Sequence, residues 1–239
     1  MTPDTEKLIE VCEATWPPAR AWNEGPLTLR DGAEGGKRVS AATALGAVSE
    51  NDIEQAEVAM RAMGQRPLFM IRTGDDALDA MLDLRGYARV DEVQMLVAPI
   101  DLLTDIPIPR VTCFTIWEPL AIMKEIWAAG GVGAQRLEVM GRAKLKTGIL
   151  ARWNEKPGGV AFAGVHGGVT MVHAVEVLPH QRKQGVAQWI MRAAAFWGAK
   201  HGASHIAVLC VTENKSATAL YTKLGFTAVG TYHYRQSPD

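Results

Sequence analysis

The sequence lacks the features that mark several large classes of protein. Its 239 residues carry 25 basic and 26 acidic side chains, a formal net charge of −1, so no positive excess is available for binding nucleic acid phosphates. No apolar run approaches the roughly 18–20 residues that cross a bilayer. The N-terminus lacks the basic start and apolar stretch of a signal peptide. We therefore expect a cytoplasmic protein that binds neither nucleic acid nor membrane.

Cysteine is also scarce. Cys12, Cys113 and Cys210 lie far apart in the chain, so no pair has the short spacing of a metal clip. An odd number of cysteines cannot all pair within one chain. We expect reduced thiols and no metal site.

What is present is an ordinary globular composition, with 48% hydrophobic and 21% charged residues. The length allows one large domain or two of about 100–130 residues each. Three prolines fall within residues 98–109 and favour an extended connector. We predict an N-terminal domain at 1–97, a linker at 98–109 and a C-terminal domain at 110–239.

The C-terminal half has alternating strand and helix patterns. Strands are predicted at 110–117, 148–153, 159–165, 169–178, 205–211 and 226–234, and helices at 118–129, up to residue 144, at 185–201 and after Asn214. Turn signals between the second, third and fourth strands predict an antiparallel meander. The order predicts an α+β fold with a mixed, mostly antiparallel sheet flanked by helices.

An internal repeat links the two halves. Residues 67–90 align without gaps on residues 206–229, with identities at Thr73/Thr212, Ala80/Ala219, Gly86/Gly225 and Val90/Val229. The order strand, turn, helix, Gly-aromatic, strand is kept throughout. This pattern indicates a degenerate tandem repeat.

The segment with the clearest chemistry lies between a strand and a helix. The strand ends at Pro179, which cannot donate a ladder hydrogen bond, and Gly185 opens a strongly amphipathic helix. A sharp turn there leaves several backbone amides unpaired near the positive end of the helix dipole, which suits a phosphate or pyrophosphate. Gly185 and Ala187 keep bulk away, and Arg182 and Lys183 add charge. A tight turn with a solvated basic edge is the alternative.

This run, Arg182-Lys183-Gln184-Gly185-Val186-Ala187, resembles the coenzyme-binding signature of the GNAT superfamily of acyl-CoA-dependent N-acyltransferases. In that signature Arg or Gln, two residues, Gly, one residue and then Gly or Ala open a helix. A second family element is similar to the segment from Asn214 through Tyr221 to Phe226. The resemblance covers about residues 110–235. The first half lacks the turn and has Leu82 where the repeat places Tyr221, so we expect it to have lost the coenzyme site and to serve as a lid or substrate wall.

The resemblance implies that acetyl-CoA, or a short-chain relative, donates an acyl group to the primary amine of a small molecule or a protein by direct attack in a ternary complex. We expect the protein to be a monomer or a homodimer. The resemblance also implies that the strand around Val175 pairs with the pantetheine arm and that the Val177 N–H holds the thioester oxygen. The implied coenzyme-binding residues are Val175, Val177, Arg182, Lys183, Gln184, Gly185, Val186, Ala187, Asn214 and Tyr221.

For catalysis, Tyr221 is the predicted general acid for the departing thiolate, the alternative being simple packing on its helix face. His173 is the predicted base, since four residues separate it from Val177 and place both on one strand face. A structural histidine, Glu176 on the opposite face, or a water relay remain open.

Two other functions stay open. One is a coenzyme-binding or regulatory module that no longer transfers acyl groups. The other is a nucleotide-binding domain. Two glycine-rich segments argue against it, because Gly131-Val132-Gly133 lacks the third glycine of a dinucleotide loop and Gly35-Gly36-Lys37 lacks the other residues of a P-loop.

Overall fold

The computed structural model describes residues 1–238. The helices are α1 (Thr5–Thr15), α2 (Lys37–Ser40), α3 (Glu50–Ala62), α4 (Asp76–Leu84), α5 (Asp101–Thr104), α6 (Ala121–Ala129), α7 (Ala134–Arg142), α8 (Val186–Lys200) and α9 (Lys215–Lys223), with a 3-10 turn at Pro179–Gln181. The strands are β1 (Arg20–Glu24), β2 (Leu27–Asp31), β3 (Thr43–Ala44), β4 (Leu68–Ile71), β5 (Ala88–Pro99), β6 (Cys113–Ile116), β7 (Lys146–Trp153), β8 (Lys156–His166), β9 (Val169–Val177), β10 (His205–Val211) and β11 (Thr227–Gln236).

One eight-stranded sheet runs through the molecule in the order β4-β11-β5-β10-β9-β8-β7-β6. The predicted meander is confirmed, because β7, β8 and β9 pair antiparallel in sequence order. The predicted strand at 110–117 is confirmed in shorter form as β6, and the helix predicted from 118 begins at Ala121. The α+β class with a mostly antiparallel sheet is confirmed, β9 and β10 being a parallel pair.

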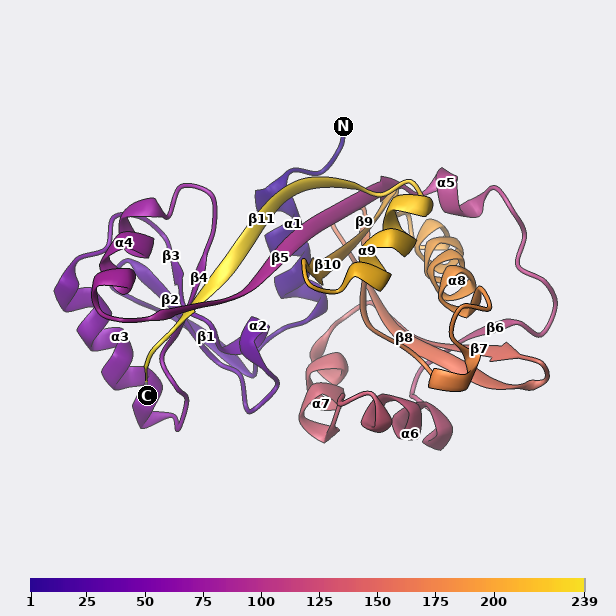
Figure 1. Ribbon diagram of the computed structural model, residues 1–239, viewed down its shortest axis with the longest axis horizontal. Helices are drawn as coiled ribbons and strands as arrows, with labels where there is room; N and C mark the ends of the chain where they lie inside the picture. The colour runs from indigo at the N-terminus through magenta and orange to yellow at the C-terminus, as the bar shows by residue number, and fades with distance from the viewer. Residues whose placement is uncertain (239) are drawn as a thin grey trace.

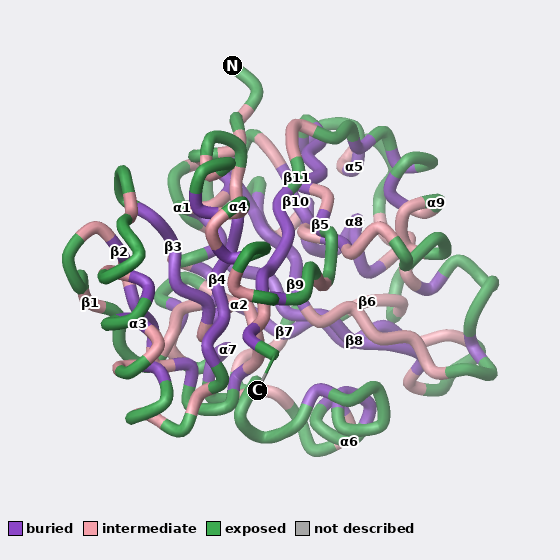
Figure 2. The backbone as a smooth tube through the Cα atoms, turned by 60° about the vertical axis from the view of Figure 1, so that its left-hand side comes forward, coloured by how far each residue is buried: buried purple, intermediate pink, exposed green. Residues whose placement is uncertain are grey.

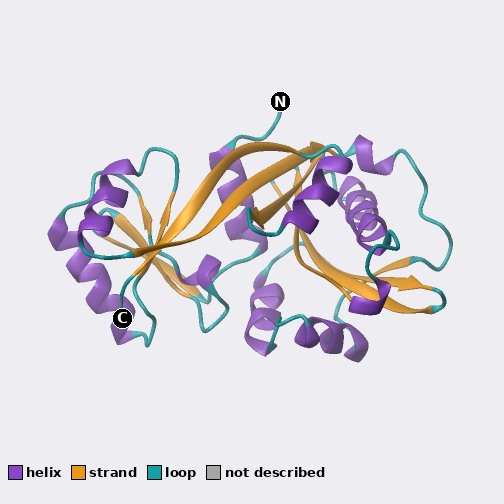
Figure 3. Ribbon diagram, viewed as in Figure 1, coloured by secondary structure: helices purple, strands orange, loops and turns teal. Residues whose placement is uncertain are grey.

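The two halves of the chain exchange their last strands (Figures 1 and 3). The strand β5 leaves the N-terminal half and pairs with β10, while β11 returns from the C-terminal half and pairs with β4. Between them β5 and β11 pair with each other along most of their length. The exchange ties both halves into one sheet.

The predicted internal repeat is visible in this exchange. The 139-residue offset maps α4 onto α9 with the same bounds and maps β5 from Ala88 onto β11 from Thr227. In the register, Ala88 pairs with Gln236 and Val97 pairs with Thr227. Because the offset also carries Val97 onto Gln236, the pairing is the one that a two-fold axis between the strands requires.

The segment predicted as a linker, residues 98–109, starts inside regular structure. Ala98 and Pro99 complete β5 and pair with β10, and α5 follows directly. The sheet therefore continues across the proposed boundary between residues 1–97 and 110–239, and that division stays a prediction.

Helices cover both faces of the sheet, and the buried residues follow its strands (Figure 2). One apolar cluster lies between the sheet and the helices α1 and α6 and contains Leu8, Trp127 and Phe162. A second lies under α8 and contains Ile190 and Val208. A third fills the N-terminal half. None of the helices in residues 1–238 combines the length and apolarity needed to cross a membrane.

Candidate functional site

A cleft opens in the sheet where two parallel strands separate. The strands β9 and β10 pair with each other from Val169–His205 to Val172–Val208. Beyond that point both strands continue, but they no longer pair with each other. The space between them is part of a cavity of about 860 Å³. Parallel strands that part in this way leave backbone N–H and C=O groups free along the inner edges of the cleft.

The turn between β9 and α8 lies at the open end of this cleft. Within the described chain, the amides of residues 183–188 have no hydrogen-bond acceptor. Lys183 (φ 60°) and Gly185 (φ 85°) adopt the left-handed conformation, which turns successive N–H groups toward one side. Six free donors at the positive end of a fifteen-residue helix form a site for an anion.

The reason for glycine at 185 differs from the sequence-based one. A Cβ at this position would meet no atom within 4 Å, so space is not limiting there. The positive φ is what favours glycine, because other L-residues adopt it at a cost of about 1–2 kcal/mol.

The other predicted residues of the turn differ in where their side chains go. Arg182 Nε donates to Val177 O (3.0 Å), so the guanidinium caps the end of β9. Gln184 Nε2 donates back to His180 O (3.0 Å), and Gln184 alone among the predicted coenzyme residues does not line the cavity. Val186 is buried in the core under α8, while Ala187 borders the cavity.

The strand β9 carries a bulge inside the cleft. Ala174 has φ 49°, and the register against β8 shifts between the pairs Phe162–His173 and Val160–Glu176. The Leu178 N–H donates to Gly158 O (3.0 Å), so the Val177 N–H before it points away from β8 and into the cleft. The predicted direction of Val177 therefore fits the geometry, although the thioester role stays a prediction.

The bulge corrects the sequence-based assignment of faces. Ala174 and Leu178 pack with the cluster on the α1 and α6 side, and the His173 ring stacks on Trp16 of the same cluster, whereas Val175 and Val177 pack under α8. One extra residue reverses the alternation that a regular strand would keep. His173 therefore shares its face with Glu176 and not with Val177, opposite to the expectation.

His173 is only 4% exposed and uses both ring nitrogens. Arg38 Nη1 lies 3.1 Å from Nδ1, and since a guanidinium only donates, Nδ1 must accept. The proton is then on Nε2, which lies 2.9 Å from Thr15 Oγ1. Burial and the nearby Arg38 hold the pKa of His173 well below its usual value. The ring is neutral, and its lone pair is already engaged.

Glu176 is the other ionisable group of β9 that borders the cavity. Burial raises the pKa of this carboxyl group, against the opposing effect of Arg182 and Arg136. A Cβ at Gly130 would overlap the Glu176 carboxyl group, so glycine after α6 gives it room. Gly130 directly follows the helix predicted at 118–129, and no local signal in the sequence indicated this role.

Trp127 is a second residue that the sequence did not single out. Its indole Nε1 donates to Ala174 O (2.8 Å), the carbonyl of the bulge. Trp127 lies in the helix predicted at 118–129, and no local signal could have revealed a partner 47 residues away.

The two predicted residues of α9 lie on the opposite side of the cleft. Asn214 Oδ1 accepts from the Ala217 N–H (3.1 Å), which caps α9 as expected. Tyr221 is 6% exposed and borders the cavity, and within residues 1–238 its hydroxyl group has no hydrogen-bond partner. Burial, with a smaller contribution from Cys210, raises the pKa of Tyr221 well above its usual value, so the phenol stays protonated.

The corresponding helix of the N-terminal half cannot bind an anion in the same way. At the start of α3, Ser49 and Asp52 form a capping box, in which the Asp52 carboxylate accepts from the Ser49 N–H (2.8 Å). A carboxylate of the chain itself therefore occupies the positive end of this helix. The loss of a coenzyme site from residues 1–97 stays a prediction.

Comparison with known proteins places this site in a family context. Residues 121–226 match the model of the acetyltransferase (GNAT) family. A search of curated proteins gave no match.

Several solved structures share the fold over nearly the whole chain. A GCN5-related N-acetyltransferase from Kribbella flavida is 19% identical, with 97% of this chain and 95% of that chain covered and a TM-score of 0.70. A functionally unknown conserved protein from Staphylococcus epidermidis is 10% identical, with 94% and 95% covered and a TM-score of 0.71. A tandem GNAT protein from the clavulanic acid biosynthesis pathway is 13% identical, with 98% and 88% covered and a TM-score of 0.60. The chain thus has the fold of tandem GNAT proteins, and residues 121–226 of its C-terminal half match the acetyltransferase (GNAT) family model.

Proposed function

We propose that the protein is an N-acetyltransferase that moves an acetyl group from acetyl-CoA to a primary amine by direct attack in a ternary complex. The observation that carries this proposal is the run of free amides at residues 183–188, which opens onto the cleft between β9 and β10. A diphosphate needs several donors aimed at one point, and the cleft gives room for an extended chain beside it.

Acetyl-CoA supplies the activated acyl group as a thioester. The free amides of the turn bind its pyrophosphate, with Lys183 adding charge nearby. The inner edge of β9 does not pair with β10 at Val175 and Val177, and its N–H groups there are offered to the pantetheine arm. Tyr221, protonated and without a partner in the described chain, donates a hydrogen bond where the sulfur would leave.

We propose Glu176, in preference to the sequence-based choice His173, as the group that takes the proton of the amine. The lone pair of His173 is engaged by Arg38, whereas the Glu176 carboxylate borders the cavity and makes no hydrogen bond within the described chain. A carboxyl group with a raised pKa is a better proton acceptor than an ordinary one.

The variant Glu176→Gln tests this choice. We expect kcat/KM at neutral pH to fall by about 100-fold, with acetyl-CoA affinity unchanged. In the wild type, activity should rise with pH through the pKa of Glu176, which lies above its usual 4.5, because only the ionised form accepts a proton. The variant should lack this part of the pH profile.

Glu125→Gln, at an exposed position of α6, is the matched control and should behave as wild type. Full turnover in Glu176→Gln, together with loss of the rise of activity with pH in His173→Gln, would assign the role of base to His173.

The function itself is tested by calorimetric titration with acetyl-CoA, ATP and NAD, followed by an assay of thiol release with a panel of amines. Binding of acetyl-CoA alone, with thiol release that depends on an amine, is the expected result. Binding without transfer to any amine would favour a coenzyme-binding module. Preference for ATP or NAD would overturn the proposal.

A further inference from the structure

An arginine from the N-terminal half reaches the cleft of the C-terminal half. Arg38 lies on the short helix α2, which sits beside β5 where the two halves meet (Figure 1). Its side chain borders the same cavity as His173 and Glu176. The N-terminal half therefore contributes a positive charge to the site.

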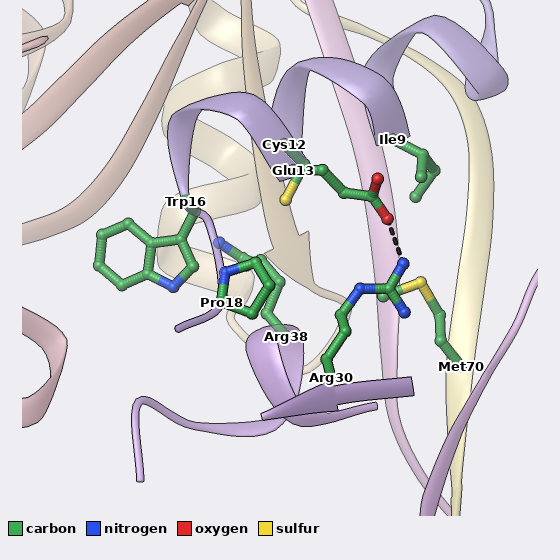
Figure 4. A pocket seen from close by; sticks show the side chains of 8 residues that line it. All are labelled: Ile9, Cys12, Glu13, Trp16, Pro18, Arg30, Arg38 and Met70. Atoms are coloured by element: carbon green, nitrogen blue, oxygen red, sulfur yellow. Dashed lines mark hydrogen bonds and ion pairs between the residues drawn. The ribbon is translucent and has the colours of Figure 1, made fainter. Parts of the chain in front are cut away.

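The neighbouring cations have carboxylate partners, and Arg38 has none. Arg30 forms an ion pair with Glu13, and Lys37 forms one with Asp91 (2.7 Å). Figure 4 shows the pair of Arg30 and Glu13, with Arg38 pointing away from it. None of the ion pairs formed among residues 1–238 includes Arg38, whose Nε is completely buried without an acceptor. Its contact with His173 Nδ1 is to a neutral ring.

The other groups near Arg38 supply no negative charge. Burial raises the pKa of the Cys12 thiol to about 11 and also raises the pKa of the phenols of Tyr232 and Tyr234. All three are uncharged at neutral pH. A partly buried guanidinium whose Nε is fully buried, with no anion nearby, is costly because it has lost water without gaining an opposite charge.

We propose that Arg38 binds a carboxylate group of the ligand that the cleft holds during transfer. The proposal rests on the proposed acetyltransferase function and narrows its substrate class. A guanidinium presents several donors in one plane, a geometry that matches a carboxylate. Arg38 contacts His173, whose ring stacks on Trp16, and Glu176 lies against Gly130 after α6. The carboxylate therefore approaches from the α1 and α6 side of the sheet.

Two sources can bring this carboxylate, and they differ chemically. It belongs either to the amine acceptor, which is then an amino acid, or to the acyl group of a dicarboxylic acyl-CoA. Matched pairs of compounds separate these sources. Amino acids are compared with their amides as acceptors, and succinyl-CoA is compared with butyryl-CoA, an acyl chain of the same length, as donor.

The first measurement is calorimetric titration of acetyl-CoA into the wild type and into Arg38→Met. It tests the proposed function separately, since wild-type protein that binds no acetyl-CoA would overturn that function. We expect the wild type and Arg38→Met to bind acetyl-CoA with equal affinity, because acetyl-CoA carries no carboxylate group for Arg38 to bind.

The second measurement compares the members of each matched pair. The transfer rates of amino acids and their amides are compared in the transfer assay, and the affinities of succinyl-CoA and butyryl-CoA are compared by calorimetry. We expect the wild type to prefer the carboxylate-bearing member of one pair by about 10- to 100-fold, and Arg38→Met to lose that preference. Arg61→Met, at an exposed position of α3, is the control and should keep it. A wild type that shows no preference in either pair would overturn the proposal without any variant. A preference that survives in Arg38→Met would overturn it as well.

Discussion

Replacing Gly185 with valine should weaken acetyl-CoA binding by about 100-fold while the protein remains folded. Valine strongly disfavours the φ of 85° found at this residue, so the turn has to rearrange. The amides of residues 183–188 then no longer point at one place. Each charge-assisted hydrogen bond contributes about 1.5–3 kcal/mol, so two misaligned donors account for the expected loss. Calorimetric titration measures it.

The chain offers a matched control at the other end of the same helix. Gly202 follows α8, has φ 81° and, like Gly185, has open space where a Cβ would lie. Gly185→Val and Gly202→Val should therefore each lower the free energy of unfolding by about 1–2 kcal/mol. Only Gly185→Val should change the affinity for acetyl-CoA. Equal affinities in wild type and Gly185→Val would remove the pyrophosphate site from this turn.

Replacing Tyr221 with phenylalanine should lower kcat by about 100-fold and leave acetyl-CoA affinity nearly unchanged. The phenol borders the cleft, and its raised pKa keeps it protonated across the neutral range, the form that donates to a leaving thiolate. Within residues 1–238 no group accepts from this hydroxyl, so its loss should cost little stability. Steady-state kinetics and thermal unfolding measure the two effects.

Tyr87→Phe gives the opposite pattern and serves as the control. Its hydroxyl donates to Glu57 (2.9 Å) in the N-terminal half, away from the cleft. This variant should lose about 1 kcal/mol of stability with full turnover. A Tyr221→Phe enzyme that is as fast as wild type at every pH would rule out the acid role and leave Tyr221 as a packing residue.

Much of the C-terminal half could be read from local patterns. The helix α8 has apolar residues at helical spacing, and the continuous apolar run from His205 to Val211 predicted β10 with the bounds observed. Such patterns are readable because the period of a helix or strand is set by neighbouring residues. The motif around Gly185 was readable for the same reason, since a strand, a turn and a helix start lie within one short segment.

The assignment of faces on β9 was not readable. It depends on the bulge at Ala174, whose carbonyl is held by the indole of Trp127. Nothing in the local sequence pattern of β9 indicates the bulge, because the extra residue is held by a partner on the distant helix α6. The choice of His173 as base depended on a regular alternation of faces along the strand and on a lone pair that Arg38 proved to engage.

The sequence by itself determined the element order, the repeat and the sharp turn before α8, because each is encoded by residues close together in the chain. Tertiary structure alone decided the exchange of β5 and β11 between the halves and the entry of Arg38 into the cleft. Both depend on pairing and packing between residues more than a hundred positions apart, and no local pattern records which distant partner a strand or a buried charge will meet.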